Sequence, residues 1–310
     1  MENWDLIIIG AGPAGLAAGI YSGRSGMKTL MIEEKMAGGE TAVAPWIENY
    51  PGFESISGAE LAGKMVTHCR KFGAQINELE KVVSLDLGGE RKLVKTEKDE
   101  YSSPAIIIAT GTHHRLLNVP GEKDFQGRGV SYCALCDGAF FKGKKVIVVG
   151  GGNSAAMSAR YLSNIAASVK LVHRREATRA EAASLGVLEK QKVGFLLNSE
   201  VKEIKGDSVV RSAVLQNNRT GEVEELEVDG VFVQVGEMPN TETAKRAGVA
   251  VDKDGFIVVD RHQRTSIPGV FAAGDATNGP VKQVGTAVGQ AIVAATEAFM
   301  YVEKPYYYEG

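Results

Sequence analysis

Cysteine is scarce in this chain, which has three in 310 residues. So few cysteines exclude the disulfide framework of a small secreted domain, and in a reducing compartment a closely spaced pair indicates redox or metal chemistry. Long hydrophobic runs are missing too, since no apolar stretch approaches the roughly 18 residues of a membrane span. With 35 Lys and Arg against 38 Asp and Glu, the sequence indicates neither a nucleic-acid nor a membrane surface. A cytoplasmic location is the default expectation.

Glycine, in contrast, is abundant at 37 residues, and part of this excess lies in a pattern that occurs twice. An apolar strand, a helix and a second apolar strand follow one another in each copy, and the continuous apolar strands are typical of a parallel sheet covered by helices. The copies are predicted at Asp5–Ile9, Ala14–Ser22 and Thr29–Ile32, and again at Lys145–Val149, Asn153–Ser163 and Val169–Val172. The chain therefore contains a duplicated mononucleotide-binding unit.

Two later strands mark the domain boundaries. Ala105–Ala109 is followed by Thr110 and Gly111, Val228–Val235 is followed by Gly236, and a proline-containing stretch comes after each. We therefore predict an α/β fold with two Rossmann-like, three-layer dinucleotide-binding domains, the second inserted into the first. The first domain comprises residues 1–115 and 241–310, and the inserted domain residues 116–240.

The first glycine motif predicts a dinucleotide site. Gly10 makes the tight turn, Gly12 lets the backbone approach a pyrophosphate, and Gly15 allows the helix to pack closely on the strand. The helix N-terminus supplies N–H groups for the phosphate. Glu33, at the end of the next strand, can accept hydrogen bonds from an adenosine ribose.

The second motif has the same spacing but a basic ending. Gly150 and Gly152 are followed by Asn153, Ser154 and Ala155, and the next strand leads into His173, Arg174 and Arg175, with Arg179 beyond them. Guanidinium groups bind a 2′-phosphate, which an acidic residue would repel. This ending favours NADPH over NADH, the alternative being a solvated basic face.

The third motif is a cysteine pair, Cys133 and Cys136, followed by Asp137. Two cysteines three positions apart can close a short disulfide, and positive potential at a helix end can stabilise an attacking thiolate. Asp137 could protonate a leaving thiolate if its surroundings raise its pKa. Half of a zinc site is the alternative, but Cys69 is alone, and His113 and His114 precede the pair by about twenty positions. Cys69, in a helix-like stretch, is expected to be a semi-buried thiol without chemistry.

Together these motifs closely resemble the low-molecular-weight thioredoxin reductases over essentially the whole chain. Further matching stretches are Ile47–Gly52, Ala109–Gly111 and Gly269–Asp275. The resemblance implies an FAD site in the first domain, formed by Gly10, Gly12, Pro13, Ala14, Gly15, Glu33, Glu34, Gly39, Glu40, Asn49, Thr110, Gly111, Gly274, Asp275, Lys282, Gln283 and Val284. It implies an NADPH site in the inserted domain, formed by Gly150, Gly152, Asn153, Ser154, Ala155, His173, Arg174, Arg175 and Arg179. No metal is expected.

The resemblance also implies an activity. The expected enzyme is a homodimer that passes electrons from NADPH through FAD and the cysteine pair to thioredoxin, or to a thioredoxin- or glutaredoxin-like protein. Both the pair and the nicotinamide site must reach one flavin, so the inserted domain is expected to rotate about residues 116–119 and 238–241 between half-reactions.

Two departures from the family pattern leave the electron donor open. Met157 and Ser158 replace two glutamates, and Glu40 replaces a glutamine. Ferredoxin or a deazaflavin coenzyme is therefore an alternative donor, although the basic residues His173, Arg174, Arg175 and Arg179 argue against it. A flavin-dependent dithiol oxidase and a non-catalytic dinucleotide-binding or redox-sensing module are the other hypotheses, and the basic cluster argues against the oxidase.

Overall fold

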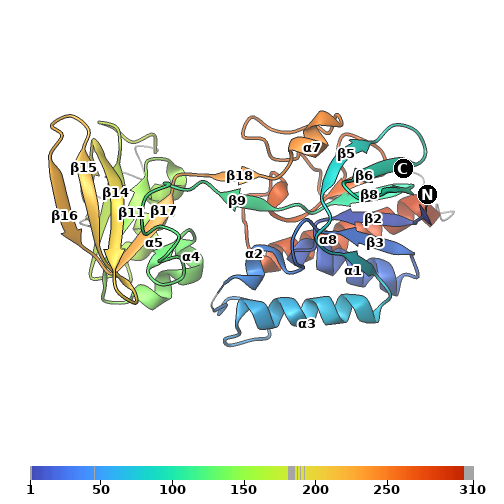
Figure 1. Ribbon diagram of the computed structural model, residues 1–310, viewed down its shortest axis with the longest axis horizontal. Helices are drawn as coiled ribbons and strands as arrows, with labels where there is room; N and C mark the ends of the chain where they lie inside the picture. The colour runs from blue at the N-terminus through green and yellow to red at the C-terminus, as the bar shows by residue number, and fades with distance from the viewer. Residues whose placement is uncertain are drawn as a thin grey trace. The chain divides into compact units, whose positions relative to one another are not determined.

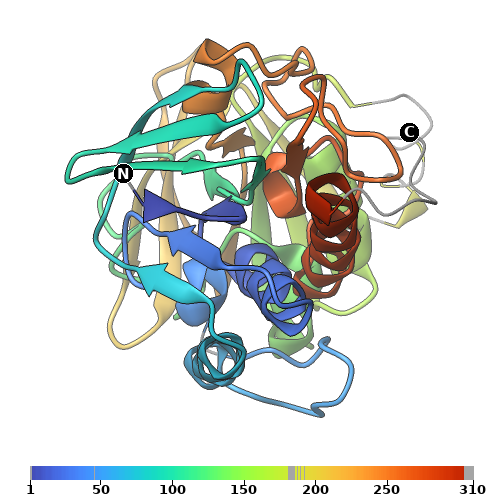
Figure 2. The same cartoon turned by 90° about the vertical axis from the view of Figure 1, so that its right-hand side faces the viewer.

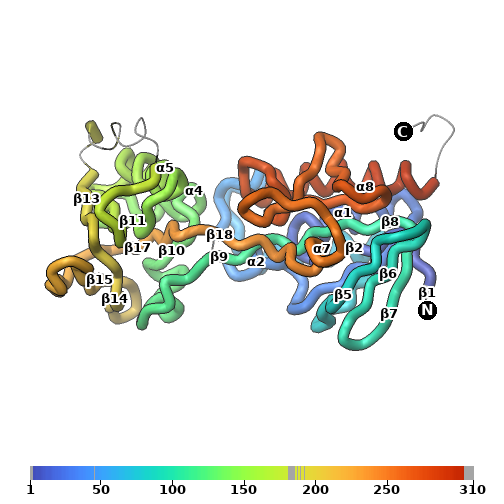
Figure 3. The backbone as a smooth tube through the Cα atoms, turned by 90° about the horizontal axis from the view of Figure 1, so that it is seen from above, coloured from blue at the N-terminus to red at the C-terminus, as the bar shows by residue number. Residues whose placement is uncertain are grey.

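The computed structural model describes residues 2–44, 46–180, 186, 188, 190–191 and 193–303. The chain forms two compact units, Met1–His113 with Met238–Gly310, and His114–Glu237. The chain passes between the two units at β9 (Thr112–His114) and β18 (Glu237–Pro239), which pair as a two-stranded sheet (Figures 1 and 3).

The first unit is built on a parallel five-stranded sheet in the order β19-β8-β2-β3-β4. Its strands are β2 (Leu6–Ile9), β3 (Thr29–Ile32), β4 (Gln75–Asn77), β8 (Ala105–Ile108) and β19 (Val270–Ala272). The longer helices are α1 (Pro13–Arg24), α3 (Gly58–Lys71) and α8 (Val284–Glu303). The short helices are α2 (Gly39–Ala42), α7 (Glu242–Arg246) and the 3₁₀ turn η2 (Gly274–Ala276). A second sheet contains β1 (Glu2–Asn3), β5 (Val82–Asp86), β6 (Lys92–Thr96) and β7 (Glu100–Ser103).

The alternation of side chains divides the core of this unit into two faces. Ile8 and Ile107 pack with α1, α3 and α8, whereas Ile7 and Ile106 pack with the second sheet. Helix α8 buries a row of small residues, so it runs close beside α1 (Figure 2). Ala287, Ala291, Ala294, Ala295 and Ala298 make up this row.

The second unit repeats the plan. Its parallel sheet, in the order β10-β17-β11-β12-β13, comprises β10 (Val130–Ser131), β11 (Lys145–Gly150), β12 (Ser168–His173), β13 (Gly194–Leu197) and β17 (Gly230–Gln234). One face packs on α4 (Ala134–Asp137), η1 (Gly138–Phe141) and α5 (Asn153–Ser163). The other packs on an antiparallel sheet of β14 (Ser199–Gly206), β15 (Val210–Asn217) and β16 (Val223–Glu227).

The predicted α/β fold with two Rossmann-like units is confirmed, with shifts of one or two residues at some element ends. Cys69 is fully buried rather than semi-buried, because it lies on the inner face of α3 with its Sγ 3.4 Å from Met31 Sδ. No described helix is both long and apolar enough to cross a membrane.

Candidate active site

The chemical centre of the second unit is a disulfide between Cys133 and Cys136. Cys133 is the N-cap of α4, and the spacing places the two Cα atoms 5.3 Å apart. The backbone N–H of Cys136 donates a hydrogen bond to Cys133 Sγ at 3.2 Å. Cys136 is exposed and Cys133 half-buried. Because α4 is a single turn, a Cys133 thiolate would be stabilised by a nearby N–H rather than by the field of a long helix.

Asp137 ends the same turn and is half-buried. Burial raises the pKa of its carboxyl group, and a hydrogen bond from Ser131 partly opposes this increase. The Ser131 hydroxyl donates to Asp137 Oδ2 at 2.6 Å. The protonated form therefore persists to higher pH than in an exposed aspartate, which meets the condition that a proton donor to a thiolate requires.

Residues distant in sequence hold the segment that precedes the disulfide. The Gln234 side chain donates to the Tyr132 carbonyl at 2.7 Å, and the Tyr132 hydroxyl donates to Glu122 Oε1 at 3.1 Å. The fully buried Glu122 also accepts the N–H groups of Leu117 and Asn118 at 2.9 and 2.7 Å. No local sequence pattern indicates these supports, because only the fold brings them to the cysteine pair.

In the first unit, the glycines of the first motif separate into two kinds. A side chain at Gly10 would place its Cβ 2.4 Å from the Ala109 oxygen, and one at Gly15 would place it 1.9 Å from the Gly10 oxygen, so the fold itself requires both glycines. At Gly12 the nearest atom is Gly39 Cα at 3.8 Å, an ordinary contact, and the backbone angles suit any residue. The fold gives no reason for glycine at position 12, whereas close approach of a pyrophosphate does.

Glu33 is fixed beside this loop. Its carboxylate accepts the N–H of Ala11 at 2.7 Å and that of Lys35 at 2.9 Å. Glu34 instead forms an exposed ion pair with Lys81 at 2.7 Å. Glu33 is therefore the better placed of the two for an adenosine ribose.

The carboxyl ends of β2, β8 and β19 bring further predicted residues to the same loop. A Cβ at Gly274 would lie 2.9 Å from Ala14 Cβ, which places the Gly274–Asp275 turn against the start of α1. Asp275 follows in that turn, and its carbonyl accepts a hydrogen bond from Lys282 at 2.9 Å. The Thr110 hydroxyl is buried without a hydrogen-bond partner. Such an orphaned group, beside an open glycine loop, fits a site built for a polar ligand.

The remaining predicted residues of this unit lie at helix starts or in the segments that connect its elements. Pro13 opens α1, where a fixed φ favours the first helical turn. Gly39 approaches Gly12, Gly111 follows Thr110 with φ 65°, and Val284 begins α8. The Asn49 side chain donates to Gln283 Oε1 at 3.0 Å. Glu40 is an exposed residue of α2.

Asn240, which the sequence analysis did not assign to the site, supports the Thr110–Gly111 segment. Its side chain donates to the Thr110 carbonyl at 2.9 Å, and its N–H donates to that of Gly111 at 3.0 Å. His113 Nδ1 lies 2.7 Å from Asn240 Oδ1. In the sequence, only the proline-containing stretch around Pro239 draws attention to this segment, and it indicates a domain boundary and not a site residue.

The second glycine loop has the same division of roles. A Cβ at Gly150 would lie 2.3 Å from the Gln234 oxygen, and one at Gly151 would lie 2.2 Å from the His173 ring. At Gly152, the N-cap of α5, a Cβ would meet nothing within 4 Å. Glycine at position 152 again fits a ligand that approaches the backbone, with the N–H groups of α5 facing it.

The basic residues next to this loop differ in exposure. His173 is buried, and burial is the main cause that lowers the pKa of its ring. Arg174, Arg175 and Arg179 are exposed, and the Arg179 N–H donates to the Gly151 oxygen at 2.6 Å. The three guanidinium groups are thus free to meet a phosphate in solution, whereas His173 packs beneath the loop and positions it. Asn153 and Ser154 are exposed in the first turn of α5, and Ala155 is buried.

The comparison with known proteins now decides the family. Residues 4–291 match the model of the pyridine nucleotide-disulphide oxidoreductases. The chain belongs to this family. It is 43% identical over 305 residues to a thioredoxin reductase of Bacillus subtilis, with 97% of this chain and 95% of the relative covered. It is 44% identical over 305 residues to one of Listeria monocytogenes, with 97% and 94% covered.

Solved structures agree with this membership. The oxidoreductase is similar to thioredoxin reductase from Streptococcus pyogenes, with a TM-score of 0.93, 41% identity, and 98% of this chain and 99% of that chain covered. It is also similar to a ferredoxin-flavin thioredoxin reductase from Clostridium acetobutylicum, with a TM-score of 0.54, 34% identity, and 98% and 100% covered. The resemblance to low-molecular-weight thioredoxin reductases is confirmed.

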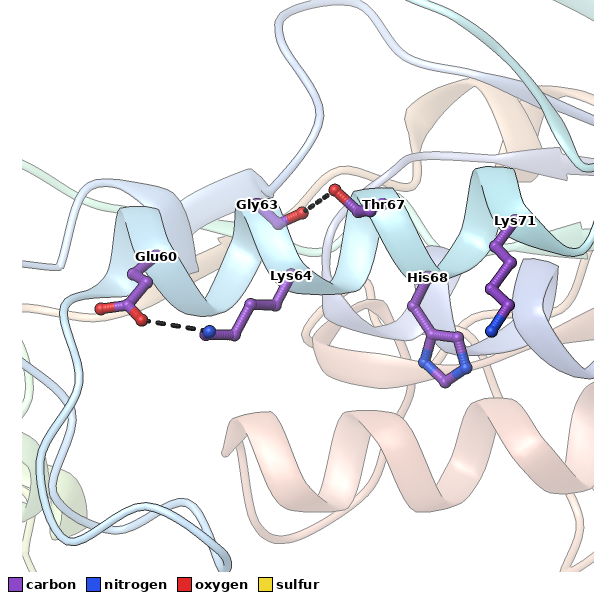
Figure 4. A pocket seen from close by; sticks show the side chains of 6 residues that line it. All are labelled: Glu60, Gly63, Lys64, Thr67, His68 and Lys71. Atoms are coloured by element: carbon purple, nitrogen blue, oxygen red, sulfur yellow. Dashed lines mark hydrogen bonds and ion pairs between the residues drawn. The ribbon is translucent and has the colours of Figure 1, made fainter.

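One depression on the surface of the first unit lies outside these sites. A shallow depression along α3 is lined by Glu60, Gly63, Lys64, Thr67, His68 and Lys71, where Lys64 already pairs with Glu60 at 3.2 Å (Figure 4). None of the predicted site residues lines it. Across the described ranges, no group of three or more His, Cys, Asp or Glu side chains could hold a metal ion.

Proposed function

We propose that this chain is an FAD-containing thioredoxin-disulfide reductase that takes its electrons from NADPH. The observation that carries the proposal is the Cys133–Cys136 disulfide, exposed at Cys136 and adjacent to the half-buried acid Asp137. The thioredoxin reductases named among its relatives, at 43% and 44% identity, support thioredoxin as the partner. A thioredoxin- or glutaredoxin-like protein of the same fold would present the same kind of disulfide.

The residues present fit both cofactors. In the first unit, Gly12 and the N-terminus of α1 would hold the FAD pyrophosphate, Glu33 the adenosine ribose, and Asp275 the ribityl chain. In the second, Gly152 and the N-terminus of α5 would hold the NADPH pyrophosphate, with the exposed arginines at its 2′-phosphate. When bound, the flavin supplies two-electron transfer between the nicotinamide and the disulfide.

The cysteine pair would then carry both electrons to the partner. Two electrons break the Cys133–Cys136 bond, and two protons convert the sulfurs to thiols, one of them supplied by Asp137. Cys133 then attacks the partner disulfide and forms a mixed disulfide, which Cys136 resolves. The partner leaves as a dithiol and the Cys133–Cys136 bond re-forms, so atoms and electrons balance.

The second unit contains both the disulfide and the second glycine loop. We propose that it rotates about the linking segments so that each reaches the flavin in turn. Backbone angles would change in the connections at residues 116–119 and 238–241, close to the paired strands β9 and β18. The homodimer and the cytoplasmic location stay predictions from the resemblance.

One specific observation favours a second electron donor. Met157 lies on α5 with 63% of its surface exposed, where the family pattern has a glutamate. The similarity to a ferredoxin-flavin thioredoxin reductase makes ferredoxin a candidate donor, alongside a deazaflavin coenzyme. A dithiol oxidase would have no use for three exposed arginines beside a nucleotide loop.

The deciding experiment mixes the purified flavoprotein anaerobically with NADPH, and separately with NADH, and follows the flavin absorbance in a stopped-flow instrument. Rapid bleaching by NADPH alone is expected. If neither nucleotide bleaches the flavin, the electron donor would instead be ferredoxin or a deazaflavin. Cys136→Ser should still be bleached by NADPH but fail to reduce thioredoxin, and retained thioredoxin reduction would remove the pair from the mechanism.

A further inference from the structure

We infer that Ser131 is a positioning residue for proton delivery at the disulfide, because its hydroxyl ties the Asp137 carboxyl group to the Cys133 backbone. The inference rests on the proposed function and adds to it a residue outside the cysteine motif. Ser131 ends β10 and is only 4% exposed, so solvent does not compete for its hydroxyl.

The geometry shows how one oxygen atom holds both ends of the redox segment. Ser131 Oγ accepts the N–H of Cys133 at 3.1 Å and donates to Asp137 Oδ2 at 2.6 Å. The Cys133 carbonyl lies farther away, at 3.3 Å. A hydroxyl has a single proton, and the shorter contact with a carboxyl group is the stronger of its two possible bonds. Ser131 therefore connects the first cysteine to the acid that follows the second.

The connection between Ser131, Cys133 and Asp137 matters when the disulfide is reduced. When the Cys133–Cys136 bond breaks, the departing sulfur needs a proton, and Asp137 can give one and recover it from water. Ser131 neither gains nor loses a proton in this step, and it only fixes where the carboxyl group lies. A hydrogen bond donated to a carboxylate also stabilises its ionised form, so Ser131 limits the increase in the Asp137 pKa that burial causes.

Other titratable groups near Asp137 have to be distinguished from this effect. Helix α5 packs on α4, and its Tyr161 ring lies against Gly138, the next residue after Asp137. On the other side, Tyr132 adjoins Cys133 and its hydroxyl donates to Glu122. Burial and the Ser131 hydrogen bond, in that order, are nevertheless the causes of the Asp137 shift. Ser131 is thus the polar group whose removal should change it most.

The test compares Ser131→Ala with Ser131→Thr in the flavin-loaded, full-length protein. One equivalent of NADPH is added anaerobically across a pH series, and the return of oxidised flavin absorbance reports electron transfer to the disulfide. A second readout, independent of the flavin, is the rate at which dithiothreitol reduces the disulfide at each pH. Bleaching by NADPH should be equal in all variants.

Ser131→Ala should slow disulfide reduction about tenfold on the acidic plateau of the pH profile, where Asp137 is protonated in every variant. The fall in rate at the basic side of the profile should move to higher pH, because the alanine removes a hydrogen bond that stabilises the ionised carboxylate. Ser131→Thr keeps the hydroxyl and should restore both the rate and the pH at which it falls. If the alanine variant fails to fold, Ser131→Thr and Ser131→Val, which differ by a hydroxyl against a methyl group, carry the same comparison. If Ser131 were only structural, Ser131→Ala would change the melting temperature but not the pH at which the rate of disulfide reduction falls.

An alanine or valine variant whose rate falls at the wild-type pH in both readouts would overturn the inference. The proposed function fails separately, if Cys136→Ser still reduces thioredoxin. If Cys136→Ser is inactive and Asp137→Asn is slow while the Ser131 variants match wild type, the reductase assignment stands and the role of Ser131 is refuted.

Discussion

Replacing Gly152 by alanine separates a glycine that serves a ligand from one that serves the fold. The backbone at Gly152 has φ −101° and ψ −177°, which any residue adopts, and an added Cβ meets no atom within 4 Å. The protein should lose about 1 kcal/mol or less, the difference between glycine and alanine as an N-cap. The melting temperature should fall by no more than about 2–4 °C.

Nucleotide binding should respond very differently. A methyl group where the backbone of α5 meets a pyrophosphate displaces the ligand, and forcing a methyl into a close contact costs about 1–3 kcal/mol. That range corresponds to about a 5- to 150-fold weaker affinity for NADPH. Stopped-flow bleaching of the flavin at several NADPH concentrations measures this as a higher half-saturating concentration.

Gly151→Ala is the matched control one residue earlier. Its Cβ would lie 2.2 Å from the His173 ring, so this variant should lose far more stability than Gly152→Ala. Wild-type NADPH affinity in Gly152→Ala would refute the assignment of the α5 N-terminus as the phosphate site. Equal destabilisation by the two substitutions would refute the distinction drawn between the two glycines.

Three further predictions follow from exposure and charge. The double variant Arg174→Ala, Arg179→Ala should raise the half-saturating NADPH concentration about tenfold or more, because both guanidinium groups are exposed beside the loop. The half-saturating NADH concentration should stay unchanged. Equal effects on both nucleotides would contradict a 2′-phosphate site. Burial raises the pKa of Cys69 to about 11, so iodoacetamide at pH 8 should label Cys133 and Cys136 in the reduced native protein but Cys69 only after unfolding; mass spectrometry showing equally fast labelling of Cys69 would contradict its burial. Because the folded-state pKa of Asp137 is raised, its contribution to stability is complete below the unfolded pKa of about 4 and is lost as pH rises through the folded value. The melting temperature of Asp137→Asn, relative to wild type, should therefore increase between pH 4 and pH 7, and a difference independent of pH would contradict the shift.

The sequence determined the architecture because its signals are local. Continuous apolar strands such as Leu6–Ile9 bury both faces, and a glycine turn followed by a helix leaves few alternatives to a parallel strand-helix-strand unit. The recurrence of that pattern near Lys145 predicted the second unit without any contact information. The cysteine spacing likewise predicted the disulfide, since residues three apart on a single turn meet without help from the rest of the chain.

Only the tertiary structure decided which residues support the chemistry. Three side chains from different elements contact the redox segment: Ser131 from the end of β10, Gln234 from β17, and Glu122 from a connecting segment. No local sequence pattern predicts these contacts. Burial is also a property of the fold: His173 is buried beneath the loop, and burial raises the pKa of Cys69. The sequence thus predicted where nucleotides and electrons would be bound and transferred, while packing determined the positions of the side chains there and the direction in which burial shifts the pKa values of Asp137 and His173.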